Sequence, residues 1–200
     1  MPPPLAALVR SLLLTGILMT PALAAIAQDD SAFTSALVAP GPADVIPAGS
    51  DIYAPLLGHW QVRVTDHLPD GSERTIDGEV LFARVLEGRA VQDLWIFPGR
   101  GGRGTDTPKS GNRYGTTLRI YDPERDVWVV DWFNPVTGTH THLIGSRSGD
   151  DIPQEGKNED GNPVRWIFSG VTATGFHWRG ERSDDGGRSW ILETEFSARR

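Results

Sequence analysis

Short segments in which apolar and polar residues alternate follow one another from residue 58 to near the C-terminus. In the first, Trp60, Val62 and Val64 take one face while Gln61 and Arg63 take the other. This period-two pattern is typical of a half-buried strand. Turn-forming Gly, Asn, Asp and Pro residues interrupt the alternation at a spacing of roughly 8–12 residues, as in β-sandwiches and barrels. The pattern predicts strands near 59–67, 73–86, 90–98, 114–121, 127–134, 139–146, 151–155, 163–170, 175–182 and 188–197.

Sequential hairpins of this kind favour one topology. An up-and-down antiparallel meander joins each strand to the next, and closure into a barrel removes the exposed sheet edges. A two-sheet sandwich is the alternative that the same pattern leaves open. We therefore expect an all-β protein, an antiparallel up-and-down meander barrel of about ten strands.

Aromatic residues recur on one face of several predicted strands. One such face per strand is enough to line a common interior. That interior could hold a cavity or be a filled core, since protein interiors usually pack closely. The sets are Trp128 with Val130 and Trp132, Val164 with Trp166 and Phe168, Phe176 with Trp178, and Trp190 with Leu192 and Phe196.

A short helical turn is predicted over 50–57, before the first strand. Ser50 is a residue type that caps helices, and Asp51 suits the positive end of a helix. Pro55 forbids a long helix here. Gly58 then lets the backbone turn into the strand at low steric cost.

The first 27 residues have the composition of a signal peptide. Arg10 precedes an apolar run over 11–19 that is too short to span a bilayer as a mature helix. Cleavage is expected after Ala27, with Ala24 as the alternative, which predicts a periplasmic or secreted protein without a membrane span. Residues 28–49, rich in Ala, Pro, Ser and Asp, are expected to form a flexible linker. Residues 50–200 then form the barrel domain.

The composition excludes some kinds of partner and some kinds of stabilising bond. The chain carries a net charge of −7 and has no basic stripe, which argues against nucleic acid as a partner. It contains no cysteine, so disulfides, thiolate metal sites and lipid attachment through a cysteine are excluded. The domain must therefore be held together by its core, and its oligomeric state stays open.

Several motifs in order give residues 50–200 a family resemblance. They resemble an uncharacterised family of bacterial secreted lipocalin-like (calycin-type) β-barrel proteins. In such folds the first-strand Trp packs at the closed end beneath an Arg from near the last strand. The resemblance assigns that role to Trp60 with Arg199 or Arg200, and it implies no reaction. The motifs are Leu57-Gly58-His59-Trp60, Leu86-Glu87-Gly88-Arg89, Leu118-Arg119-Ile120-Tyr121-Asp122 before a strand with Trp128, Asp185-Gly186-Gly187-Arg188-Ser189-Trp190, and Arg199-Arg200.

The last predicted hairpin carries the pattern Ser183-x-Asp185-x-Gly187-x-x-Trp190, the Asp box of sialidases and other β-propellers. A propeller needs several blades with a repeat in each, and the sequence has one copy. We therefore expect a structural hairpin, in which Asp185 accepts backbone hydrogen bonds and Trp190 anchors the turn in the core. The residues expected to have structural roles are Gly58, Trp60, Asp185, Trp190 and Arg199.

His140 and His142 share one face of a predicted strand, about 7 Å apart along it. Two imidazoles so placed could bind zinc, copper or a haem iron, and some distant relatives in the barrel superfamily bind haem. No third ligand stands at a suitable spacing, so the alternative is a hydrogen-bonded polar pair. The cofactor is therefore left unknown.

Two charged residues fall in phase with aromatic neighbours: Asp93 with Trp95, and Arg84 with Phe82. Polar groups among aromatics can orient a ligand in an apolar pocket. We therefore expect an exported barrel that binds a small apolar or aromatic molecule. The alternatives are an enzyme acting in the barrel lumen, a haem- or metal-binding barrel, and an interaction module with a filled core; no catalytic set could be assembled. The expected ligand-binding residues are Arg84, Asp93, Trp95, Trp132, His140 and His142.

Overall fold

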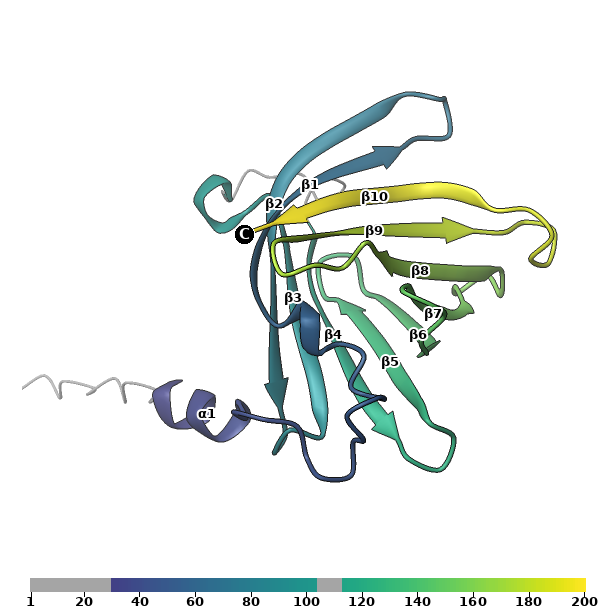
Figure 1. The fold of residues 1–200 in the computed structure, drawn as a ribbon. Helices are drawn as coiled ribbons and strands as arrows, with labels where there is room; N and C mark the ends of the chain where they lie inside the picture. Colours follow the sequence, from purple (N-terminus) through teal and green to yellow (C-terminus); the bar gives the residue numbers. More distant parts are fainter. Residues whose placement is uncertain (1–29, 104–112) are drawn as a thin grey trace, which may run out of the picture.

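The ten predicted strands form a closed antiparallel barrel. The structure is a computed structural model, and it describes residues 30–103 and 113–200. Each strand pairs with its neighbours in the chain, and β1 closes the ring by pairing with β10 (Figure 1). The predicted meander barrel is thus confirmed, and the sandwich is excluded. The strands are β1 Gly58–His67, β2 Glu73–Val85, β3 Ala90–Phe97, β4 Arg113–Asp122, β5 Val127–Asn134, β6 Thr139–Gly145, β7 Ile152–Lys157, β8 Pro163–Ser169, β9 Gly175–Arg182 and β10 Ile191–Arg199.

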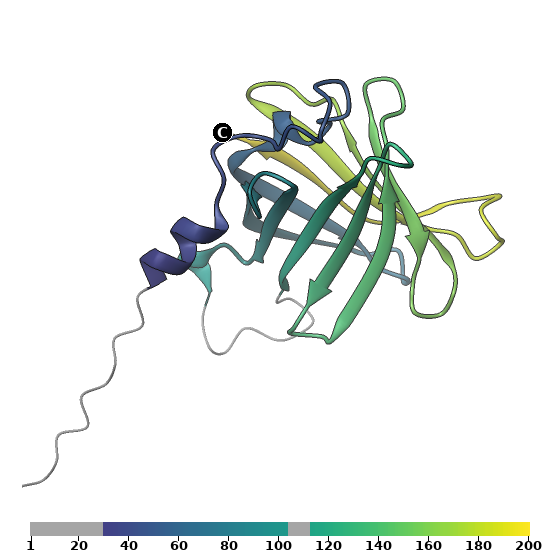
Figure 2. The same ribbon diagram turned by 90° about the horizontal axis from the view of Figure 1, so that it is seen from below.

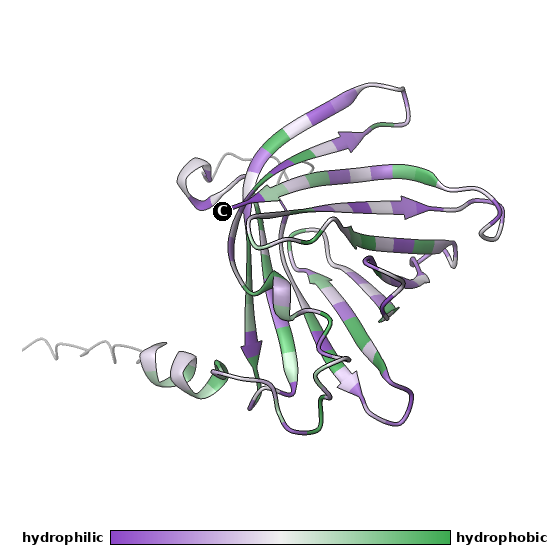
Figure 3. Ribbon diagram, viewed as in Figure 1, coloured by the Kyte–Doolittle hydropathy of each residue, from purple (hydrophilic) through white to green (hydrophobic). Residues whose placement is uncertain are grey.

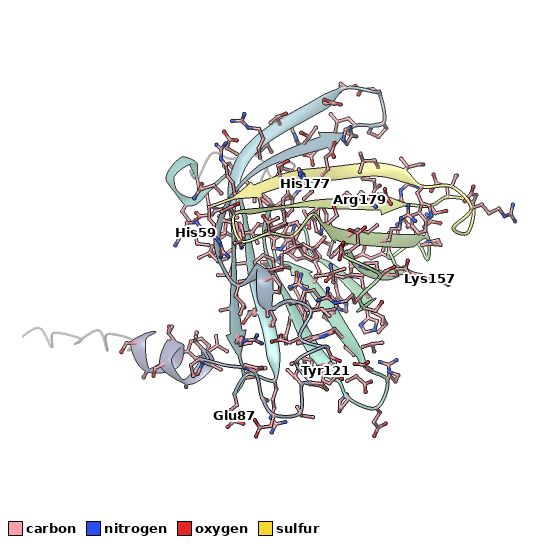
Figure 4. All side chains as sticks on the ribbon, viewed as in Figure 1. His59, Glu87, Tyr121, Lys157, His177 and Arg179 are labelled. Atoms are coloured by element: carbon pink, nitrogen blue, oxygen red, sulfur yellow. The ribbon has the colours of Figure 1, made fainter. Side chains whose placement is uncertain are left out.

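Alternation of side chains along each strand separates the interior from the outer wall. In β1, Trp60, Val62 and Val64 are buried, whereas Gln61 and Arg63 are exposed. Figure 3 shows the same alternation as changes of hydropathy along the strands. Side chains crowd the space that the strands enclose, as Figure 4 shows. The aromatic faces predicted for β5, β8 and β9 lie in this interior.

The final strand begins three residues later than expected, because the Asp box holds the chain in a turn. Asp185 Oδ1 accepts hydrogen bonds from the backbone N–H groups of Arg188 and Ser189, at 2.9 Å each. These hydrogen bonds hold the pKa of Asp185 down at about 2. Trp190 is half-buried, whereas we expected it in the core. Its ring lies against Arg165, whose guanidinium carbon is 4.0 Å from the Trp190 ring centroid.

One end of the barrel is closed by the chain that precedes β1. The 3-10 helix η1, Ala54–Leu56, is the predicted helical turn, although Ser50 bonds Asp126 instead of capping it. Tyr53 and Leu56 are completely buried beneath the strands. Glu87 marks this closed end in Figure 4, and Lys157 marks the strand ends on the opposite, open side.

The first-strand Trp lies at the closed end, beneath a C-terminal arginine. The guanidinium carbon of Arg200 is 4.0 Å from the centroid of the Trp60 ring, and Arg200 Nη1 donates to the Leu57 carbonyl over 2.7 Å. Gly58, at φ +116°, leaves room for this approach, because an added Cβ would lie 2.7 Å from Arg200 Nη1. Arg200 therefore takes the role that the resemblance offered to Arg199 or Arg200. Arg199 is exposed on the outer wall.

The segment that was expected to be a linker is partly attached to the barrel. Helix α1, Asp30–Leu37, stands away from the strands (Figures 1 and 2). The chain after it is held by backbone hydrogen bonds from Ala39 N to Arg84 O and from Ala43 N to Gly88 O. Such bonds need no periodic side-chain pattern, so composition alone did not reveal them. The predicted signal peptide, residues 1–27, lies outside the described residues.

Across residues 30–103 and 113–200, no helix has both the length and the apolar character needed to cross a bilayer.

Candidate ligand-binding site

Four tryptophans form a ring just inside the open end of the barrel. Their centroids are 5.5 Å apart for Trp95 and Trp132, 6.3 Å for Trp132 and Trp166, 6.0 Å for Trp166 and Trp178, and 4.8 Å for Trp178 and Trp95. Each indole thus touches two others, and the cycle closes. We call this set the Trp ring. Its members come from β3, β5, β8 and β9, so it spans much of the barrel's circumference.

Two inward-facing glycines make room for the Trp ring. A Cβ at Gly115 in β4 would lie 2.4 Å from Cη2 of Trp132. A Cβ at Gly180 in β9 would lie 2.7 Å from Cη2 of Trp178. No side chain fits at either position without moving an indole. The absence of a Cβ is therefore what lets both rings occupy the mouth of the barrel.

The Trp ring lines one side of an open pocket of about 220 Å³. Ligand pockets for drug-sized molecules usually measure roughly 300–1,000 Å³, so this one suits a molecule of one or two rings. Three hollows are larger. Two, of about 380 and 500 Å³, lie on the outer wall around Gln61 and Asp77, and one of about 270 Å³ lies at the closed end beside Ile52 and Pro55. The remaining pocket-lining residues are Arg113, Asn134, Gly180, Glu193 and Thr194.

A buried carboxylate ties several strands together at the mouth. Asp66 in β1 accepts hydrogen bonds from Arg113, from Arg74 Nη2 over 2.8 Å and from Thr194 Oγ1 over 3.0 Å. Burial raises the pKa of this carboxyl, but the hydrogen bonds outweigh burial and place the pKa below its ordinary value. Asp66 therefore stays ionised and fixes the position of Arg113 beside the pocket.

A bulge brings a second charge to the rim. The register between β9 and β10 shifts between Leu192 and Thr194, so Glu193 leaves the regular alternation and lines the pocket. Its Oε1 accepts a hydrogen bond from Arg182 Nε over 2.9 Å. The same bulge separates Leu192 from Phe196, so the face predicted for Trp190, Leu192 and Phe196 does not form.

Two members of the Trp ring have an unused donor. The Nε1 atoms of Trp95 and Trp178 are buried and have no hydrogen-bond partner among the described residues. Leaving a buried donor unpaired costs about 1–3 kcal/mol.

Below the Trp ring the interior is filled by a polar network. Arg119 Nη1 lies 2.7 Å from Asp93 Oδ2, and both side chains are completely buried. Arg119 Nε donates to Gln154 Oε1 over 2.9 Å, and the Tyr53 hydroxyl donates to the same oxygen over 3.1 Å. Burial raises the pKa of Tyr53. This network links the closing segment to the floor of the pocket.

The structure brings only part of the predicted site together. Trp95 and Trp132 line the pocket. Asp93 is the next inward-facing residue of β3 below Trp95. Its carboxylate forms an ion pair with Arg119 and accepts a hydrogen bond from the Thr117 backbone N–H over 2.7 Å. Arg84 lies at the closed end, where it forms an ion pair with Asp51. Arg84 is thus on the inward face, as predicted, but away from the pocket.

The two histidines lie on the outer wall, not in the lumen. His142 pairs across the ladder with Asp131 and His140 with Phe133, both outward-facing residues of β5. His140 Nε2 and His142 Nδ1 lie 3.0 and 2.9 Å from Asp131 Oδ1, so they form the hydrogen-bonded polar pair that was the alternative to a metal site. Within the described part of the chain, no three His, Cys, Asp or Glu residues are grouped to hold a metal ion.

The sequence-based prediction missed seven of the nine residues that line the pocket, and four of these show why. Trp166 and Trp178 were placed on inward faces, and their in-phase positions could have extended the predicted site. Arg113 shares the inward phase of Gly115, but it stands at the edge of a long glycine-rich loop where no period is visible. Glu193 depends on the bulge, for which the sequence has no clear signal.

Comparison with known proteins supports the fold. No protein-family model matches the sequence, and no curated protein matches it. The crystal structure of Rv2717c from M. tuberculosis superposes with a TM-score of 0.53 at 15% identity, covering 80% of this chain and 98% of that one. The S-type phycobiliprotein lyase CPES from Guillardia theta superposes with a TM-score of 0.45 at 8% identity, over 78% of this chain and 94% of that one. At these identities the likeness to Rv2717c is one of fold, that of a lipocalin-like meander barrel.

Proposed function

We propose that this protein binds a small, planar and largely apolar molecule in the Trp-ring pocket. The observation that carries the proposal is the closed cycle of four indoles beside a pocket at the open end of the barrel. Aromatic walls with a few fixed polar groups are the usual composition of a small-molecule site. Here the polar groups are Arg113, Asn134, Glu193 and Thr194.

The shape of the interior supports a ligand at the mouth rather than deeper in the lumen. The floor is occupied by the Arg119 network and by buried rings such as Phe168 and Phe176. Contacts within the Trp ring are edge-to-face or tilted. A planar ligand that packs against an indole gains about 0.5–1.5 kcal/mol beyond its buried area. Several such contacts are enough for a specific site.

We also propose that the protein acts outside the cytoplasm, in the periplasm or the medium. The support is the charge and hydropathy pattern of residues 1–27. N-terminal sequencing of the mature protein should begin near Gln28. A chain that still begins at Met1, or one retained in the membrane, would contradict this proposal.

Truncation of one Trp-ring member should weaken binding selectively. We expect isothermal titration calorimetry to detect binding of at least one of indole, 3-methylindole, indole-3-propionate and naphthalene. Trp166 is partly exposed and can be truncated with less damage to the core than the others. Trp166→Ala is expected to raise Kd at least tenfold, which corresponds to about 1.4 kcal/mol.

Trp190→Ala is the matched control, since Trp190 is half-buried on a hairpin outside the pocket. It should leave Kd unchanged. If none of the four compounds bound the wild type, or if both variants lost binding equally, the Trp-ring pocket would not be the site.

A further inference from the structure

Two residues of opposite charge line the rim of the Trp-ring pocket. Arg113 comes from the start of β4, and Glu193 comes from the bulge in β10. No ion pair between them is formed among the described residues, so each is held by a different partner. The rim therefore presents a cation and an anion at separate points above a shared aromatic wall.

Arg113 is fixed in place by Asp66, but most of its N–H donors are not engaged in that contact. Its guanidinium contacts Asp66 through Nη2 alone. A guanidinium has five N–H donors, and its preferred contact with a free carboxylate is bidentate. Its side chain is 26% exposed, so solvent or a ligand reaches it. Arg113 can therefore donate hydrogen bonds to a second carboxylate while it keeps its contact with Asp66.

Glu193 is in the complementary position. Its Oε1 accepts from Arg182, while Arg182 also forms an ion pair with Asp184. One guanidinium is thus shared between two carboxylates, and the Glu193 side chain is 48% exposed. The second oxygen of Glu193 can accept hydrogen bonds from an ammonium group.

We propose that the ligand is an aromatic zwitterion of the α-amino-acid type. Its ring packs against the indoles of the Trp ring, its carboxylate contacts Arg113, and its ammonium group contacts Glu193. The cation and the anion at the rim favour a ligand that carries both a carboxylate and an ammonium group over a purely apolar one. This inference rests on the proposed function, and it adds the two charges that would distinguish an amino acid from a neutral aromatic compound.

The test is a series of four ligands that share one indole and differ in charge. L-tryptophan carries both groups, indole-3-propionate only the carboxylate, tryptamine only the ammonium, and 3-methylindole neither. Calorimetric titration at pH 7 should give the lowest Kd for L-tryptophan, at least tenfold below that of 3-methylindole. Each singly charged compound should fall between them.

Two variants at the rim test which residue contacts the ligand's carboxylate and which contacts its ammonium group. Arg113→Gln should raise Kd at least fivefold for L-tryptophan and indole-3-propionate and leave tryptamine unchanged. Glu193→Gln should raise Kd for L-tryptophan and tryptamine and leave indole-3-propionate unchanged. The unaffected ligand in each case shows that the variant is folded and its pocket intact.

The outcomes separate this inference from the proposed function. If 3-methylindole bound as tightly as L-tryptophan, the zwitterion proposal would fail while the aromatic pocket stood. If only indole-3-propionate bound tightly, with Glu193→Gln without effect, the ligand would be an aromatic acid and Glu193 would have no part in recognition. If no compound in the series bound, both proposals would be overturned.

Discussion

Replacing Arg119 by methionine is expected to lower the free energy of unfolding by about 3–5 kcal/mol, because it strands a buried carboxylate. Arg119 and Asp93 are both completely buried, and the guanidinium is the charged partner of that carboxylate, 2.7 Å away. Methionine keeps much of the length of the arginine stem, so lost packing contributes little. Urea unfolding, followed by tryptophan fluorescence, measures the loss.

A double variant distinguishes the stranded charge from a simple loss of contacts. In Asp93→Asn/Arg119→Met both charges are gone, while an amide oxygen is retained to accept from the Thr117 backbone. Because a neutral pair has no uncompensated charge, the double variant should be more stable than Arg119→Met alone. If the two substitutions instead destabilised additively, the buried ion pair would not be the source of the effect.

Trp60→Ala should destabilise the protein by about 3–5 kcal/mol, the range for large truncations in a core. Trp60 is fully buried, donates to the Leu56 carbonyl over 2.6 Å and packs edge-to-face on Phe176 at 4.9 Å. It also supports Arg200, which connects the C-terminus to the segment before β1. Its loss therefore opens the closed end of the barrel as well as leaving a cavity.

Trp190→Ala removes the same side chain from a half-buried hairpin and is the control for this truncation. Its main described contact is with Arg165, and such cation–π contacts at exposed sites contribute about 0.5–1 kcal/mol. Its denaturation midpoint should thus stay close to that of the wild type. Equal shifts for the two variants would show that Trp60 has no special place in the fold.

The strands could be predicted because each carries its own period-two pattern between recognisable turns. The inward faces of β5, β8 and β9 followed directly from Trp128, Trp166 and Trp178. Arg200 could have been distinguished from Arg199 in the same way, since it continues the phase of the buried residues Phe196 and Ala198. Local alternation is thus informative wherever one face is clearly apolar.

The prediction that the two histidines face the lumen was wrong, because the first half of their strand has no apolar face that marks the inward side. Thr139-His140-Thr141-His142 is polar on both faces, so only the preceding turn decides which face points inward. In that turn Asn134 Oδ1 accepts from Val136 N over 3.0 Å, and Gly138 adopts φ +78°. The resulting register sets Thr141 opposite Trp132 and sends both imidazoles outward.

Charged residues inside the barrel were the other feature that the sequence could not resolve. Arg119 appeared as one polar residue among alternating neighbours, and nothing local showed that Asp93 and Gln154 would surround it. These contacts join the paired strands β3 and β4 to β7, and Arg119 and Gln154 are 35 residues apart along the chain. Their assembly depends on barrel closure and register, which no single strand encodes.

The two ends of the barrel have different roles. At the closed end, Tyr53, Trp60 and Arg200 provide packing and hydrogen bonds that seal the interior. At the open end, the Trp ring lines a pocket, and glycines at 115 and 180 replace side chains that would displace two of its indoles. On the proposed function, substitutions at the closed end are expected to change stability and those at the open end to change ligand binding.

If the ligand binds against the Trp ring, as we propose, the seven tryptophans of this chain report its position directly. Protein labelled with 5-fluorotryptophan should give one ¹⁹F resonance per site, each assigned by a single Trp→Phe variant. On titration with L-tryptophan or 3-methylindole, we predict shifts for Trp95, Trp132, Trp166 and Trp178. The resonances of Trp60, Trp128 and Trp190 should stay in place. Shifts confined to those three sites, or no shift at saturating ligand, would show that the Trp ring does not bind the ligand.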